Sequence, residues 1–343
     1  MDLKDDVGPT LKDIAEAAGI SVTAVSKVLN NRGGVSVGNR ERVLKIVEDL
    51  GYRGRGGKSS APDRVAIVML DRYVTNNAFF SEIVDGVLEA AEMNGIVADV
   101  SVVTSERIAA GHDTKLWEGS PHGSILIGLD RKEAIDLVQR AGIPSVIVNG
   151  MDRSMRISSV SPDYHFGGWA ATQRLLELGH RDIVHVTHPH RESIKRRLDG
   201  FRDALEEFGI CFDPRNHVLD LGNADLISVN ARAVIEQFLA ERQTLPTALF
   251  CVADIVAIAA IQATRGLGYS VPDDISVIGF DDLSIGAHSS PPLDTVRIDR
   301  RQLGRIAVKT LVEKLSGGDL AVKRINVGVE LVVRESVTPI TPG

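Results

Sequence analysis

The chain has 343 residues, more than one ordinary domain holds, so we expect two or three domains. With 43% hydrophobic and 25% charged residues, the composition excludes a disordered or fibrous protein. The sequence has no run of about eighteen apolar residues, which excludes a transmembrane helix. The net charge of −7 is uneven, because ten lysines and arginines face eight acids in the first 60 residues and the remainder must carry −9. A weakly basic N-terminal part followed by an acidic remainder indicates that only the N-terminal part binds a polyanion.

Three short helices are predicted between residues 10 and 51. Thr10, Ser21 and Ser36 are the helix-capping residues, and Gly19 ends the first helix. Apolar residues that follow the helical repeat are expected to face the core: Leu11, Ile14, Ala15 and Ala18, then Val25, Val28 and Leu29, then Val43, Ile46, Val47 and Leu50.

Two helices joined by a tight glycine-containing turn, with a third in support, form the layout of a helix-turn-helix DNA reader. In the second helix, Val22 suits a thymine methyl, Thr23 a base edge and Lys27 the acceptors of guanine. The helix N-termini and Ser26 suit phosphate oxygens. The predicted DNA contacts are Thr10, Ser21, Val22, Thr23, Ser26, Lys27, Asn30, Arg53 and Arg55. From periodicity alone, a three-helix bundle with a solvated polar face is the alternative.

Two motifs in this region imitate catalytic or phosphate-binding signatures. Residues 34–38 read Gly-Val-Ser-Val-Gly, the letters of a nucleophile elbow, but they fall between two helices, where Ser36 serves as a cap. Gly56-Gly57-Lys58-Ser59 lacks the first glycine of a phosphate loop, since that place holds Tyr52. We interpret the second motif as part of a linker.

Residues 10–30 read TLKDIAEAAGISVTAVSKVLN, and this stretch resembles the N-terminal signature of the LacI family of bacterial transcription regulators. Val35-Ser36, residues 40–43 and Leu50-Gly51-Tyr52 continue the match at the expected spacing. The resemblance implies that Val22, Thr23 and Lys27 occupy the family's main base-reading positions. It also implies a double-stranded DNA operator as partner.

Residues 53–62 are predicted to form a flexible basic linker, rich in glycine and serine. In the LacI family this segment usually forms a hinge helix that inserts a leucine into the minor groove. Here it has no leucine and three glycines, each costing about 1 kcal/mol in a helix interior. We therefore predict contacts to phosphates and the minor groove through Arg53, Arg55 and Lys58 in place of a leucine wedge.

From Arg64 onward, apolar runs alternate with amphipathic segments, a pattern typical of parallel sheets with helices on both faces. The predicted strands are 65–70, 96–103, 124–129, 145–149, 182–187, 248–253 and 275–280, and the predicted helices are 79–94, 166–178, 192–208 and 255–266. Cys211 and Cys251 each lie in an apolar stretch, which predicts buried free thiols in a reducing cytoplasm. The acidic start, without an apolar stretch, predicts no secretory signal and so also favours the cytoplasm.

The resemblance extends over the body, through residues 76–83, 178–181, 197–201, 272–282, 291–296 and 331–336. It implies an α/β protein, with a small all-α helix-turn-helix head on a two-lobed body like a periplasmic sugar-binding protein. The domains expected are 1–52 for DNA binding, 53–62 for the hinge and 63–343 for effector binding and dimerisation. The first lobe is expected to hold about 63–161 and 292–322, and the second about 162–290 and 323–343.

Polar residues at strand ends that face a cleft are the candidates for holding a small-molecule effector: Asp71, Asn149, Arg197, Asp254 and Asp281. By resemblance, Arg197 and Asp281 match positions that bind polar effector groups, and Asn149 falls where the founding member has a sugar-contacting acid. Phe79 and Phe80 match positions lining the family's pocket and suit stacking on a sugar or base ring. Ala253 replaces the family's usual asparagine, which argues against a standard sugar effector.

His185, His188 and His190 have no cysteine or acid at ligand spacing, so we expect no metal site and no cofactor. The pairs Asp273-Asp274 and Asp281-Asp282 have no accompanying nucleophile, so we expect no enzyme activity. The sequence thus predicts a repressor that acts as a homodimer and responds to a sugar, nucleoside or related metabolite. A solute-receptor type of binding protein, or a regulator without an effector, are the alternatives left open.

Overall fold

The structure is a computed structural model that describes residues 10–29, 34–50, 64–74, 78–111, 121–188, 191–222, 227–317 and 321–340. The chain divides into two compact units, Met1–Asp63 with Val312–Leu320, and Arg64–Leu311 with Ala321–Gly343. We call the helices before residue 51 the head and the second unit the body. Within the described ranges, no helix is both long and apolar enough to cross a membrane. The predicted linker 53–62, with Arg53 and Arg55, and the predicted contact Asn30 lie outside the described residues.

The head consists of the three predicted helices, α1 (Leu11–Ala18), α2 (Val22–Leu29) and α3 (Val37–Asp49). Helix α1 begins with a reciprocal capping box, in which Thr10 Oγ1 accepts from Asp13 N and the Asp13 carboxylate accepts from Thr10 N at 2.6 Å. It ends at Gly19, whose φ of 66° is the left-handed conformation that glycine adopts readily. The predicted boundaries of α1 are therefore confirmed.

One apolar cluster joins the three head helices. Its buried members are Ile14, Ala15, Ala18, Val25, Val28 and Val43. The inward orientation predicted for Leu50 is wrong, because this side chain is 43% exposed. Helix α3 ends at Asp49, so Leu50 lies beyond the last residue whose position the helical repeat fixes.

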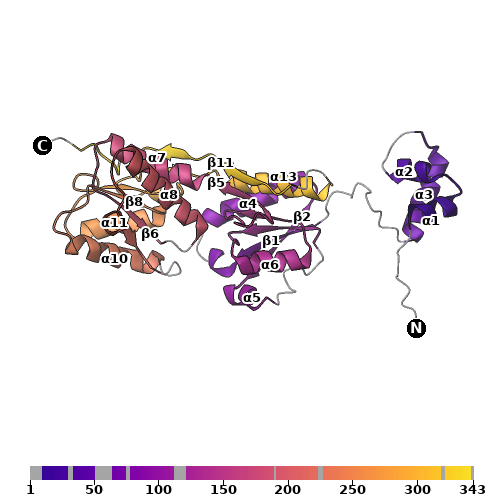
Figure 1. Ribbon diagram of the computed structural model, residues 1–343, viewed down its shortest axis with the longest axis horizontal. Coiled ribbons are helices and arrows are strands. Elements are labelled where there is room, and N and C mark those ends of the chain that lie inside the picture. Colours follow the sequence, from indigo (N-terminus) through magenta and orange to yellow (C-terminus); the bar gives the residue numbers. More distant parts are fainter. Residues whose placement is uncertain are drawn as a thin grey trace. The chain divides into compact units, whose positions relative to one another are not determined.

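The first lobe of the body is a six-stranded parallel sheet in the order β11-β5-β4-β3-β1-β2. Its strands are β1 (Arg64–Leu70), β2 (Val97–Val103), β3 (Gly123–Ile127), β4 (Ser145–Val148), β5 (Ser158–Pro162) and β11 (Arg324–Val327). Its helices are α4 (Ala78–Met93), α5 (Ser105–Ala110), α6 (Lys132–Ala141) and α13 (Arg300–Leu315). A short 3-10 helix, η1 (Asp71–Tyr73), lies between β1 and α4. Figure 1 shows α4 and α13 on one face of this sheet and α5 and α6 on the other.

The second lobe contains a four-stranded parallel sheet in the order β7-β6-β8-β9, next to the antiparallel pair β10-β12. Its strands are β6 (Ile183–Thr187), β7 (Val218–Asp220), β8 (Ala248–Cys251), β9 (Ser276–Ile278), β10 (Thr295–Arg297) and β12 (Glu330–Val332). Its helices are α7 (Tyr164–Glu177), α8 (Glu192–Glu207), α9 (Pro214–His217), α10 (Ile227–Glu241), α11 (Asp254–Gly266) and α12 (Ser284–Ala287). The predicted α/β class with parallel sheets is confirmed.

Strand pairing moves two of the expected lobe boundaries. Residues 294–297 were expected in the first lobe, but Asp294 bridges Ile278 and Gly279 N donates to Asp294 O at 2.8 Å, so this segment extends the second sheet. Strand β11 was expected in the second lobe, but it pairs with β5 of the first. Because lobe membership follows from strand partners, both crossings come a few residues later than the sequence placed them.

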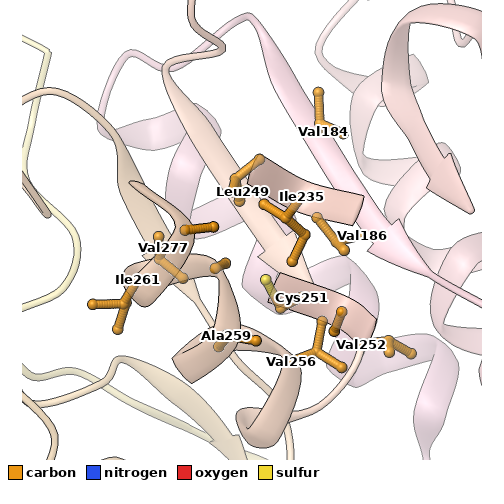
Figure 2. Packing of buried hydrophobic residues seen from close by; sticks show 14 of the residues in the cluster. Val184, Val186, Ile235, Leu249, Cys251, Val252, Val256, Ala259, Ile261 and Val277 are labelled. Carbon is orange, nitrogen blue, oxygen red and sulfur yellow. The ribbon is translucent and has the colours of Figure 1, made fainter. Parts of the chain in front are cut away.

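Apolar side chains of β6, β8 and β9 pack with those of α10 and α11 to form a core of the second lobe (Figure 2). Cys251 on β8 is fully buried among them, as predicted, next to Val252 and Val256. The prediction of a buried thiol at Cys211 is wrong, since this residue is exposed. Cys211 follows the end of α8 in a connecting segment, where no second layer covers it.

Candidate functional site

Helix α2 of the head carries the candidate DNA-reading face. Val25 and Val28 are buried against α1 and α3, so the opposite side of the helix is turned to solvent. On that side Val22 is 44% exposed, and Thr23 and Lys27 are exposed too. An apolar side chain, a hydroxyl and a cation project together from the first two turns, as a helix that contacts base edges requires.

The start of α2 also suits an anion such as a backbone phosphate. Ser21 Oγ accepts a hydrogen bond from Ala24 N at 3.1 Å, which caps the helix, and the first turn contains no acid to neutralise its partial positive charge. Thr10 is exposed at the start of α1, and Ser26 is partly buried on α2. Of the predicted DNA contacts, the described ones thus fall at the two helix starts and along α2.

In the body, the carboxyl ends of the strands of both sheets meet in one cluster of polar and aromatic side chains. From the first lobe, Asn149 follows β4 in the left-handed conformation, with a φ of 57° and 3% exposure. Tyr164, at the start of α7, donates its hydroxyl hydrogen to Asn149 Oδ1. Arg191, at the start of α8, donates from Nη2 to Asn149 O at 2.8 Å. These contacts join the two lobes at the position that parallel sheets commonly offer to ligands.

Arg197 and Asp281, both predicted from the sequence as effector contacts, belong to this cluster and contact each other. The Arg197 guanidinium, 6% exposed, donates to Val252 O and to Asp281 Oδ1 at 3.3 Å. Its carbon lies 3.9 Å from the ring centre of Phe280 and 4.8 Å from that of Tyr164. Burial raises the pKa of Asp281 to about 6, against the opposing effect of the Arg197 and Arg300 charges.

Arg300 connects the second lobe to helix α4 of the first. Its guanidinium donates to Asp281 O and, through Nη2, to Glu82 Oε1 at 2.9 Å, with the arginine only 7% exposed. It also lies 5.7 Å from the ring centre of Phe79. Phe79 and Phe80, both predicted for the effector site, begin α4 and are buried, and Phe80 stacks on Tyr73 at 4.1 Å. The aromatic rings therefore border the polar cluster.

The remaining strand-end candidates have other surroundings. Asp254 is fully buried inside the second lobe, where its carboxylate accepts from Leu283 N at 2.6 Å and from Thr295 Oγ1 at 2.5 Å. The two oxygens thus join the start of α11 to the segment after β9 and to β10, the two segments that flank Asp281. Burial, followed by the charge of Asp281, raises the pKa of Asp254 to about 7. Asp71 is exposed at the start of η1 and contacts none of these residues in the described part of the chain.

Several residues of the cluster were not predicted. Asp130, whose Oδ2 lies 3.9 Å from Arg191 Nη2, directly follows a predicted strand, so the rule that selected Asn149 also applies to it. Arg191 directly precedes a predicted helix, so its position was also visible in the sequence. Tyr73, Glu82 and Arg300 gave no such signal, because they depend on segments brought together only in the folded chain.

The motifs set aside in the sequence have structural roles. Ser36 Oγ accepts from Asn39 N at 3.4 Å at the start of α3, which is the predicted capping position. His185 is fully buried on β6, stacked 4.5 Å from the ring centre of Phe250, and burial lowers its pKa to about 3. A neutral histidine in an aromatic core serves packing.

Sequence comparisons agree with this two-part architecture. Residues 10–54 match the family described as bacterial regulatory proteins, lacI family, and residues 172–337 match a periplasmic binding protein-like domain. The HTH-type transcriptional repressor PurR of Photobacterium profundum is 30% identical, over 96% of this chain and 98% of its own. The ribose operon repressor of Haemophilus influenzae is 29% identical over the same shares.

Solved structures show the same likeness. The transcriptional regulator CelR in complex with cellobiose superposes with a TM-score of 0.72 at 28% identity, covering 96% of this chain and 99% of that one. The lac repressor dimer bound to operator and the anti-inducer ONPF gives 0.69 at 26% identity, covering 97% and 100%. These relatives are regulators and not enzymes, which agrees with the prediction from the motifs. From its capped reading helix to its two-lobed body, the chain belongs to the lacI family of bacterial regulatory proteins.

Proposed function

We propose that this chain is a transcriptional repressor that binds an operator through α2 and changes its affinity when a small molecule binds between the lobes. The exposed face of α2, with Val22, Thr23 and Lys27 on a capped helix, is the observation that carries the proposal. Side chains of this kind read base edges in the major groove, whereas the helix N-termini hold phosphates. The chain acts in the cytoplasm, where DNA and metabolites meet.

The effector-binding residues proposed are Phe79, Phe80, Asn149, Arg197 and Asp281, joined by Arg191 and Arg300. Relatives include a ribose operon repressor and a regulator solved with cellobiose, which supports a sugar, nucleoside or related metabolite as effector. Because residues of both lobes take part, a ligand that prefers one angle between the lobes shifts the population toward it. That shift changes the spacing of two paired heads, and thereby operator affinity.

Two copies are proposed to pair through the first lobe. Apolar side chains are exposed on α4 and on the edge strand β2: Leu88, Met93, Val97, Val100 and Val102. Exposed apolar side chains gathered on neighbouring elements of this kind are typical of an interaction site. A dimer is also required by the operator, since one helix-turn-helix unit reads only about half of a two-fold symmetric site.

A gel-shift titration of genomic fragments with the full chain tests the DNA-binding role. We expect one or a few fragments to bind specifically, and Lys27→Ala to weaken that binding by about tenfold or more, as loss of a base contact worth about 1–3 kcal/mol implies. Lys45→Ala is the matched control, because Lys45 is an exposed lysine on α3 outside the reading face. Equal binding to every fragment, or intact specific binding by Lys27→Ala, contradicts the proposal.

A further inference from the structure

Three arginines in the interlobe cluster have hydrogen-bond donors that the described residues do not satisfy. The Nε atoms of Arg191, Arg197 and Arg300 are each buried without a hydrogen-bond partner in the described part of the chain. Arg197 and Arg300 are 6% and 7% exposed, so solvent reaches them little. A buried donor without an acceptor lowers stability by roughly 1–3 kcal/mol, more when the group is charged. Three such donors in one cluster indicate that a group from outside the chain supplies the acceptors.

The neighbouring carboxylates satisfy few of the hydrogen-bond donors of these arginines. Asp130 approaches Arg191 only to 3.9 Å, and Asp130 Oδ2 is itself buried without a hydrogen bond to any residue that the structure describes. Asp281 makes one contact with Arg197, at 3.3 Å, although a carboxylate and a guanidinium can form two parallel bonds near 2.8 Å. Glu82 is well paired with Arg300, but its side chain is 39% exposed and solvent weakens its charge.

We infer that the effector of this chain carries an oxyanion, a carboxylate or a phosphate, and that Arg197 and Arg300, joined by Arg191, bind it. The inference rests on the proposed function, in which a small molecule occupies this cluster. Arg197 and Arg300 both contact Asp281, which places their guanidinium groups next to each other. Guanidinium groups match the planar, two-oxygen edge of a carboxylate or phosphate better than any other side chain does.

Donor and acceptor counts favour an oxyanion over a neutral hydroxyl group, because three unsatisfied Nε donors outnumber the one unsatisfied acceptor of the cluster in the described residues, Asp130 Oδ2. A guanidinium N–H only donates, whereas a sugar hydroxyl brings a hydrogen that needs an acceptor of its own. An oxyanion has acceptors alone, so it satisfies several buried N–H groups without adding a new unpaired donor. Phe79 and Tyr73 border the cluster and leave an apolar edge for the carbon part of the molecule.

Inorganic phosphate is the direct probe of such a subsite. Thermal unfolding of the full chain is followed in potassium phosphate and in potassium chloride of equal ionic strength. We expect phosphate to raise the melting temperature of the body by about 2–4 °C at tenfold excess over its dissociation constant. Arg300→Met is expected to abolish the rise. Arg301→Met is the matched control, because Arg301 pairs with Asp85 and Glu89 of α4. This variant should keep the phosphate-dependent rise in melting temperature.

A second variant keeps the inference testable if Arg300→Met does not fold. Arg191→Gln removes a guanidinium that the described chain holds by one carbonyl hydrogen bond, so it should fold and show a smaller phosphate effect. Glucose, gluconate and glucose 6-phosphate then separate the sources of the anion, since only the charged members should stabilise the protein through Arg300. The inference is overturned if phosphate gives no more than chloride, if Arg300→Met keeps the effect, or if the neutral sugar stabilises as much as its charged counterparts. Operator binding by the wild-type chain, measured in parallel, reports on the proposed function independently.

Discussion

Asp281 and Asp254 show how burial of single carboxyl groups shapes the candidate effector site. Asp281 adopts a φ of 114°, a conformation that side-chain-bearing residues rarely adopt, and is held there by Asp281 N donating to Val296 O and by Arg300 binding its carbonyl. Asp254 supports the same turn by accepting from Leu283 N. Strain at one residue is thus held by hydrogen bonds from three segments, as is common at binding sites.

Asp254 should make stability depend on pH in a particular direction. Its pKa is raised from 3.8 to about 7, so between these values the folded chain keeps a proton that the unfolded chain releases. The free energy of unfolding should therefore fall as pH rises from about 4 to about 7, by about 1.4 kcal/mol per pH unit at the steepest point. Asp254→Asn removes this contribution. Chemical denaturation of both proteins at several pH values measures the difference, and a flat difference would refute the assignment.

At the scale of elements, each lobe contains one pair of helices in backbone contact through glycines. In the first lobe Gly304 of α13 lies against Ile83 and Val87 of α4, and Gly86 of α4 lies against Arg301. In the second lobe Gly168 of α7 faces the backbone of Arg197 on α8. These contacts position two of the arginines of the site, because Arg300 begins α13 and Arg197 lies within α8.

Gly304→Ala tests the first of these contacts. A methyl group there would lie 2.5 Å from Ile83 O and 2.6 Å from Val87 N, so the two helices must separate. We expect the body to lose about 1–3 kcal/mol of unfolding free energy, as other overpacking changes do. Gly266→Ala serves as control, since its neighbours at 3.3 Å and beyond are ends of the flexible Arg232 and Glu236 side chains. Equal melting temperatures for the two variants would show that α13 and α4 are not fixed by this contact.

At the scale of the whole molecule, pairing of two chains determines how many heads reach the operator. Val100→Glu places a charge on the exposed edge strand β2, where Val100 is 48% exposed in the single chain. If β2 lies in the dimer interface, the variant should sediment as a monomer and bind operator about tenfold more weakly or worse, because only one half-site is then read. Val333→Glu changes a residue that is 54% exposed elsewhere on the body and should leave both properties unchanged. A Val100→Glu variant that remains dimeric would exclude this surface.

Local sequence was sufficient for the elements that capping residues and periodic apolar positions define. The head helices, strands β1 and β6 and helices α4, α8 and α11 were predicted to within a few residues, because each carries its own caps or apolar repeat. The fold class follows from the same alternation. Arg197 and Asp281 were predicted as effector contacts from their polar character near strand ends and from the family resemblance.

Elements stabilised by their neighbours were missed. Strand β5 reads Ser-Ser-Val-Ser-Pro and has no apolar pattern, yet every residue is buried, and β4 and β11 pair with its backbone on the two edges. Strands β10 and β11 were assigned to the wrong lobes, since strand partnership depends on long-range pairing. Local patterns do not record which distant segment completes a sheet.

The sequence by itself determined the helix α2 of this protein, its cap, and those strands and helices that carry their own caps or apolar repeat, because these depend on residues within a few positions of one another. Only the tertiary structure placed Arg300 against Asp281 and Glu82, and Arg191 against Asn149. The partners of these contacts are between 19 and 218 positions apart in the chain, and their contacts arise from how two sheets direct their carboxyl ends toward each other. The donors left without partners there follow from burial, a property of the folded chain alone.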